Sequence, residues 1–106
     1  MSEQLAELKK NGSSGGSNEI TRIINSQTVT SFPIVKGNVY VICYYHASTN
    51  KASFSNITID STAGGYAMLY NGTYVFTSIG IATATGTCNI SGRASGWMLA
   101  GVWQVS

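Results

Sequence analysis

Acid–base and nucleophilic chemistry in this chain rests on very few side chains. The sequence holds one histidine, His46, one aspartate, Asp60, and the glutamates Glu3, Glu7 and Glu19. His46 and Asp60 could join a serine in a hydrolytic triad, but no strand-to-helix context of the kind that presents a catalytic serine accompanies them. We therefore expect no enzymatic activity and no catalytic residue.

Metal chemistry is equally poorly supported. Cys43, Cys88 and His46 lack the paired ligand spacing of structural zinc sites, so we expect no metal and no other cofactor. Each cysteine lies inside a strand-like segment. Two states remain open for this pair, a disulfide or two buried thiols.

Ligand binding by aromatic and polar side chains is the better prospect. Aromatic rings stack on the apolar faces of sugars, while amides and hydroxyls bond the ring hydroxyls. Binding residues concentrate on loops carried by a rigid scaffold, so those near predicted loops are favoured. The candidate ligand-binding residues are Tyr45, His46, Asn50, Lys51, Tyr66 and Arg93.

The elements that position these residues are predicted to be strands. From residue 18 onward, β-branched and aromatic residues occur in runs broken by Gly, Asn and Ser. The predicted strands cover residues 20–25, 28–32, 38–47, 53–60, 66–70, 73–82, 86–90 and 97–105. Eight short strands without intervening helices predict an all-β, antiparallel β-sandwich of jelly-roll-like type.

One hairpin is specified most strongly. Asn71-Gly72 joins two apolar-rich runs, and both residue types tolerate the positive φ of a two-residue type I′ turn. Such a turn would place Leu69 opposite Tyr74. Large apolar side chains then lie on both faces of the hairpin, and a sheet apolar on both faces must be covered twice.

Two other strands also carry bulky apolar residues on both sides of the pleat. In residues 39–45 the two sets are Val39, Val41, Cys43 and Tyr45, and Tyr40, Ile42 and Tyr44. One set would form a larger apolar patch than monomers usually expose, so we expect an oligomer to cover it. The predicted interface residues are Tyr40, Ile42, Tyr44, Met98, Ala100 and Val102.

Residues 1–11 differ from the rest of the chain. Met1, Leu5 and Leu8 have the spacing of heptad d, a and d positions, which predicts a short coiled-coil remnant, with a simple leader as the alternative. Residues 12–17 consist of Gly and Ser and predict a flexible linker. The β-sandwich head would then cover residues 18–106.

Composition narrows the class of partner. Charged residues make up 9% of the chain, against about 25% in an average domain, which suits an extracellular β module. The basic residues are scattered and the net charge is only +2, so we expect no nucleic-acid partner. No apolar run approaches the length of about 20 residues that spans a bilayer, so no membrane insertion is expected.

A coiled-coil remnant, a short linker and a β domain ending in Gly101-Val102-Trp103-Gln104-Val105-Ser106 together resemble the C-terminal head of bacteriophage tail-fibre and tail-tip receptor-binding proteins. The turn and strand over residues 34–41 are also similar to those of such heads. The resemblance implies a homotrimer at the tip of a virion tail fibre, which attaches to a bacterial surface saccharide or protein. It transfers no site residue.

Two other functions share parts of this pattern. A carbohydrate-binding module of a secreted bacterial enzyme would have the same sandwich and aromatic residues but would be monomeric. A structural trimerisation knob would have the same oligomeric state but bind no ligand.

Overall fold

The computed structural model of the chain describes residues 19–106, and all regular structure within this range is β-strand. The strands are β1 (Ile20–Ile24), β2 (Ser31–Ile34), β3 (Val39–His46), β4 (Ser53–Phe54), β5 (Ile57–Tyr70), β6 (Thr73–Ala82), β7 (Gly86–Ser91) and β8 (Met98–Val105). The predicted coiled-coil segment and linker lie outside the described residues.

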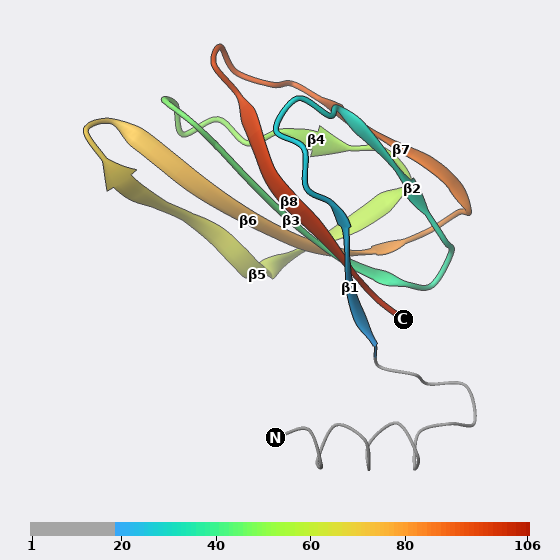
Figure 1. The fold of residues 1–106 in the computed structure, drawn as a ribbon. Helices are drawn as coiled ribbons and strands as arrows, with labels where there is room; N and C mark the ends of the chain where they lie inside the picture. The colour runs from blue at the N-terminus through green and yellow to red at the C-terminus, as the bar shows by residue number, and fades with distance from the viewer. Residues whose placement is uncertain (1–18) are drawn as a thin grey trace, which may run out of the picture.

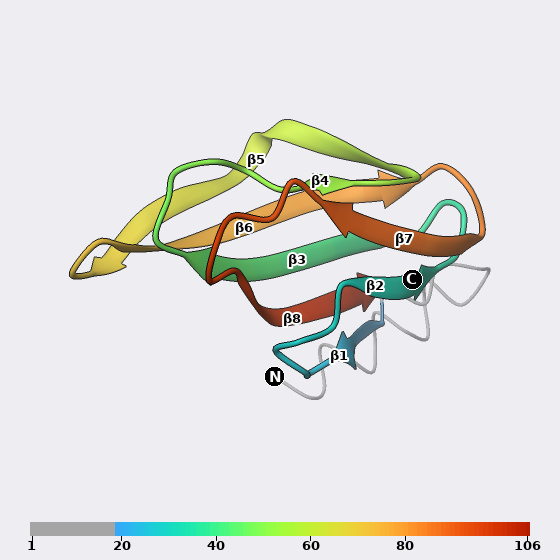
Figure 2. The same cartoon turned by 90° about the horizontal axis from the view of Figure 1, so that it is seen from above.

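The strands form two antiparallel sheets, which confirms the predicted β-sandwich (Figure 1). The large sheet has the order β1-β8-β3-β6-β5, and the small sheet has the order β2-β7-β4. Figure 2 shows the five strands of the large sheet side by side. Only β5 and β6 are consecutive strands of one sheet, so the chain otherwise crosses between sheets at every connection, as in jelly rolls.

The core lies between the two sheets. Along β3, the side chains of Tyr40, Ile42, Tyr44 and His46 are buried, whereas the alternate residues are only half-buried. Buried partners from β2 and β7 complete this layer: Phe32, Ile34, Cys88 and Ile90. The side chains on the inner face of β3 are therefore those that we expected on the outside of the sandwich.

The prediction that Tyr40, Ile42 and Tyr44 contact another subunit is therefore wrong, because each is fully buried within one chain. Both sets on β3 are bulky and apolar, so the alternation alone does not say which faces inward. The inner set contains tyrosines whose hydroxyls find partners at the rim of the sandwich. Tyr40 Oη donates to Gln104 Oε1 at 2.7 Å, and Tyr44 Oη accepts from the Ala52 N–H at 3.0 Å.

An irregularity in β8 changes the second predicted interface set. Cys43 of β3 lies opposite Gly101, but the next residue, Tyr44, lies opposite Leu99, so Ala100 is an extra residue at a β-bulge. As a result Val102 is fully buried, and its predicted subunit contact is also wrong. Ala100 is half-buried, and Met98 remains exposed.

The region between β4 and β6 departs from the predicted strand boundaries. Residues 53–60 were predicted as one strand, but Asn56 has a φ of 61°, in the left-handed region, and separates β4 from β5. Strand β5 then continues through the expected loop before Tyr66. It does so because its pairing with β6 shifts between Ile59 and Gly64.

The predicted hairpin turn is present. Asn71 and Gly72 have φ values of 49° and 84°, as a type I′ turn requires. The predicted register is wrong by one residue, because Met68 rather than Leu69 lies opposite Tyr74. Leu69 is the extra residue of a register shift next to the turn.

Candidate functional site

The face of the large sheet that points away from the small sheet, here called the outer face, carries side chains in cross-strand rows. These rows are Ile20, Val105, Val39, Ile81 and Thr58; Arg22, Trp103, Val41 and Ile79; Gly101, Cys43, Thr77 and Gly65; and Met98, Tyr45, Val75 and Ala67. Within residues 19–106, no element covers this face. Ile20, Ile81 and Met98 are 68%, 51% and 37% exposed.

Arg22 is the one charged residue in these rows. Its guanidinium lies 5.1 Å from the Trp103 ring centroid, and its Nη2 donates to the Ala100 carbonyl at 2.7 Å. Its Nε donates to the Ile24 carbonyl at 3.2 Å. The Arg22 guanidinium is therefore held by backbone carbonyls of β1 and β8. The rest of the outer face is apolar or weakly polar.

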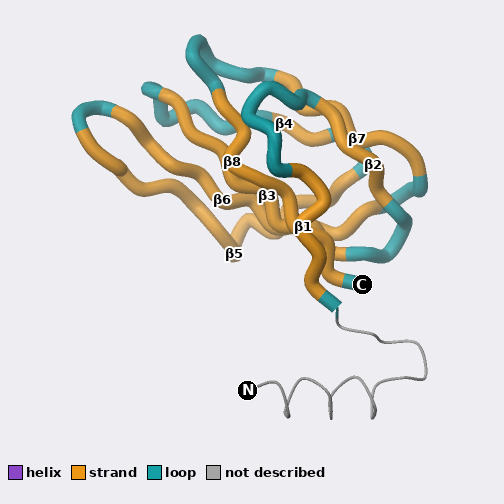
Figure 3. Tube along the Cα trace, viewed as in Figure 1, coloured by secondary structure: helices purple, strands orange, loops and turns teal. Residues whose placement is uncertain are grey.

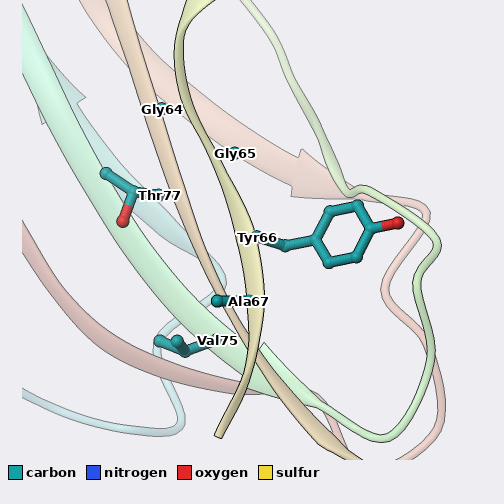
Figure 4. Close-up of a pocket in the computed structure, with 6 residues that line it drawn as sticks. All are labelled: Gly64, Gly65, Tyr66, Ala67, Val75 and Thr77. Atoms are coloured by element: carbon teal, nitrogen blue, oxygen red, sulfur yellow. The ribbon is translucent and has the colours of Figure 1, made fainter.

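The outer face is hollowed where β5 bends. One hollow of about 450 Å³ is lined by residues 64–67 of β5 and by Val75 and Thr77 of β6, and Figure 4 shows Val75 and Thr77 on one side of the hairpin with Tyr66 pointing to the other. A second hollow of about 390 Å³ lies beside Ile81 at the start of β5. Side chains of another molecule can enter such hollows.

Three connections gather, beside the connection from β1 to β2, at one end of the sandwich, here called the loop end (Figure 3). They follow β3, join β5 to β6, and join β7 to β8. The hairpin of β5 and β6 extends beyond the small sheet at this end (Figures 1 and 2). Together they enclose a cavity of about 420 Å³, lined by Tyr45, His46 and Ala47, by Leu69 and Thr73, and by Ser95 and Gly96.

His46 is among the residues that line this cavity, but its side chain packs in the core. Its side chain is 2% exposed and stacks on Phe76, with ring centroids 4.6 Å apart. The Ser48 N–H donates to Nδ1 at 3.0 Å, which assigns the hydrogen of a neutral ring to Nε2. Nε2 is buried and has no hydrogen-bond partner in the described structure. Trp97, which follows the lining residue Gly96, has an unpartnered buried Nε1 as well.

The structure brings several predicted ligand-binding residues to the loop end. Tyr45 and His46 line the cavity. Tyr66 is 49% exposed and packs against Phe76, 5.2 Å between ring centroids. Asn50 and Lys51 lie exposed in the connection between β3 and β4, and Arg93 lies exposed in the connection that supplies Ser95 and Gly96. These last three residues do not line the cavity.

Sequence reasoning missed the other lining residues. Leu69 and Thr73 flank the Asn71-Gly72 turn that it did identify, and Ser95 and Gly96 occupy a Gly-containing loop. The available signal was therefore turn composition, because residues beside tight turns at one end of a sandwich become neighbours in space. Which turns share an end follows only from the strand order.

The residues considered for a triad are not brought together. His46 lies opposite Tyr74, and Asp60 follows Ile59, which lies opposite Gly80. Those β6 positions are about 20 Å apart at about 3.4 Å per residue. The Asp60 carboxylate instead accepts from the Thr62 hydroxyl and N–H, bonds that lower the pKa of Asp60.

The two cysteines are free thiols in the structure and lie on different sheets. Cys88 is fully buried in the core, and burial raises its pKa to about 11. Cys43 lies half-buried on the outer face, where burial also raises its pKa. No group of three potential metal ligands occurs among residues 19–106.

No family model, curated protein or solved structure matches this chain. In the described range there is also no helix with the length and apolar character needed to cross a membrane.

Proposed function

We propose that this chain is a non-catalytic, homotrimeric head domain at the tip of a phage or phage-like tail fibre, which attaches to a saccharide or protein on a bacterial surface. The observation that carries the proposal is the apolar outer face. Val39, Val41, Ile79 and Trp103 lie together there in a single chain. Such a face is unfavourable in water and is stabilised when another copy covers it.

A second copy is the occupant that the chain itself favours. The heptad-like spacing in residues 1–11 predicts association of N-terminal helices, and those residues precede β1. Strand β1 forms one edge of the outer face, where Ile20 is 68% exposed. Helices that bring copies together would therefore place the outer faces close to one another.

The placement of the chain ends favours a role at a fibre tip. Ile20 and Val39 lie opposite Val105, whereas the other end of β3 lies opposite Met98. The described chain thus begins and ends away from the loop end, as Figure 1 shows. A stalk attached at residue 19 would leave the loop end free for contact with a receptor.

The interface is tested by charge substitution on the outer face. Ile81→Asp should dissociate the trimer and leave the fold of each chain intact, because Ile81 is 51% exposed in one chain but would be buried between copies. Thr87→Asp, on an exposed position of β7, is the matched control. Sedimentation velocity should give three times the chain mass for the wild type and Thr87→Asp, and the single-chain mass for Ile81→Asp.

Attachment is tested with fluorescently labelled protein on a panel of intact bacteria. The proposal expects wild-type adhesion to some strains and weaker adhesion by Ile81→Asp, because separated heads lose multivalent binding. A wild type that sediments as a single chain contradicts the assembly. A trimer that adheres to no strain contradicts attachment and favours a structural knob.

A further inference from the structure

We propose that the cavity at the loop end binds a neutral sugar, as a single ring or as the terminal unit of a glycan. This inference rests on the proposed function, because it gives attachment a place and a ligand class. The cavity of about 420 Å³ falls within the usual range for small-molecule sites, about 300–1,000 Å³. It is formed by three separate connections of the chain, as binding sites on rigid scaffolds commonly are.

The chemistry of the walls selects a neutral, hydroxyl-rich ligand. Tyr45, Thr73 and Ser95 bring hydroxyls, while Ala47 and Leu69 bring apolar surface. None of the lining residues is Asp, Glu, Lys or Arg, so a phosphate or carboxylate would find no countercharge in the walls. Tyr45 Oη already accepts from Gln27 Nε2 at 3.1 Å, which leaves its own hydrogen for a ligand acceptor.

One lining residue, His46, also holds a buried donor without an acceptor. Because Nδ1 of His46 accepts from Ser48, the hydrogen on Nε2 has no partner in the described residues. A buried donor left unpaired is unfavourable, and buried polar groups in native proteins are nearly always paired. Nε2 has no accessible surface in the structure, so a sugar hydroxyl would reach this donor only if the side chains packed around His46 move, and the hydroxyls of Tyr45, Thr73 and Ser95 are the contacts that the cavity itself offers.

Nuclear magnetic resonance on the ¹⁵N-labelled full chain tests the cavity directly. The probes are glucose, galactose, mannose and N-acetylglucosamine, with glucuronate and glucose 6-phosphate as charged counterparts. At least one neutral sugar should produce saturable shifts of the Gly96 and Thr73 amides and of the Trp97 indole. The indole of Trp103, on the outer face, serves as the internal reference and should not move.

Two variants locate the binding. Ala47→Phe places a ring in the cavity from an exposed position, so it should abolish the shifts and leave the spectrum otherwise folded. His46→Phe keeps an aromatic ring against Phe76 and removes only the covered Nε2 donor, so it should leave sugar affinity within about twofold of the wild type. The Ala47→Phe variant decides the question even if His46→Phe is poorly folded.

The inference is overturned if no neutral sugar moves the cavity signals, if only the charged sugars do, or if Ala47→Phe binds like the wild type. Its failure is separable from failure of the proposed function. Adhesion to bacteria that Ala47→Phe retains in full leaves attachment standing and removes the cavity as its site. If neutral sugars shift the cavity signals but the protein adheres to no strain, the cavity remains a sugar site and the attachment function is contradicted.

Discussion

Tyr40 shows how single polar atoms hold the core of this sandwich. Its buried ring carries a hydroxyl that accepts from the Val35 N–H at 2.8 Å and donates to Gln104. Tyr40→Phe should lower the free energy of unfolding by about 1–3 kcal/mol, because both partners lose a bond. Urea denaturation followed by tryptophan fluorescence measures the change.

Tyr45→Phe is the matched control for that substitution. The Tyr45 hydroxyl bonds only the exposed Gln27 side chain, which water can replace. The change in unfolding free energy should stay within about 0.5 kcal/mol. If both variants lose the same free energy of unfolding, the hydroxyl of the buried Tyr40 contributes no more to stability than that of Tyr45.

Cys88 predicts a dependence of stability on alkaline pH. The folded chain holds its thiol proton up to a pKa of about 11, whereas the unfolded thiol ionises near its ordinary value of 9.0. The unfolded state therefore loses the proton first as pH rises, so this stabilising contribution is complete below pH 9.0 and lost as pH approaches about 11.

The measurement is the urea midpoint of wild type and Cys88→Ala between pH 8 and pH 11. The variant is less stable throughout because it loses buried volume, but its midpoint should fall less steeply above the ordinary thiol pKa of 9.0. Parallel curves for the two proteins would contradict the assignment of this pH dependence to Cys88.

At the scale of elements, the close crossing of β5 over β6 depends on Gly80. A Cβ at this position would meet the Thr58 carbonyl oxygen and the Ile57 side chain. Gly80→Ala should therefore cost about 1–3 kcal/mol of unfolding free energy by forcing backbone apart. Thr83→Ala, at an exposed position just after β6, should be near neutral in the same denaturation series.

The sequence predicted the elements better than their orientation. Runs of β-branched and aromatic residues predicted β3 and β8, and Asn71-Gly72 predicted the hairpin. Alternation could not say which side of β3 faces the core, because both sides are bulky and apolar. Single extra residues at Ala100 and Leu69 then changed the facing and the register, and nothing in their types marks them as bulges.

The loop end was predictable in part for a related reason. Tyr45, His46 and Tyr66 were identified because they lie near turns, and the structure places them at one end. Their companions come from connections that become neighbours only through the order of strands in the sheets. Trp97, which follows Gly96, packs its ring 5.5 Å from that of Tyr44.

At the scale of the whole molecule, association through the outer face predicts a concentration-dependent thermal midpoint. A trimer that is more stable than its separate chains is favoured by mass action, so the wild-type midpoint should rise with protein concentration. The midpoint of Ile81→Asp should not. Scanning fluorimetry over a wide dilution range checks both, and a constant wild-type midpoint would argue for an isolated chain.

The two ends of the described chain are bonded to each other. The Glu19 N–H donates to the Ser106 carbonyl at 2.9 Å, and the Ser106 N–H donates back to Glu19 at 3.1 Å. The first and last described residues are therefore neighbours, and the backbone from residue 19 to residue 106 nearly closes on itself. A permuted gene that joins residue 106 to residue 19 and opens the chain between Asn71 and Gly72 would keep every other strand connection, so the order of synthesis could be rearranged around one architecture.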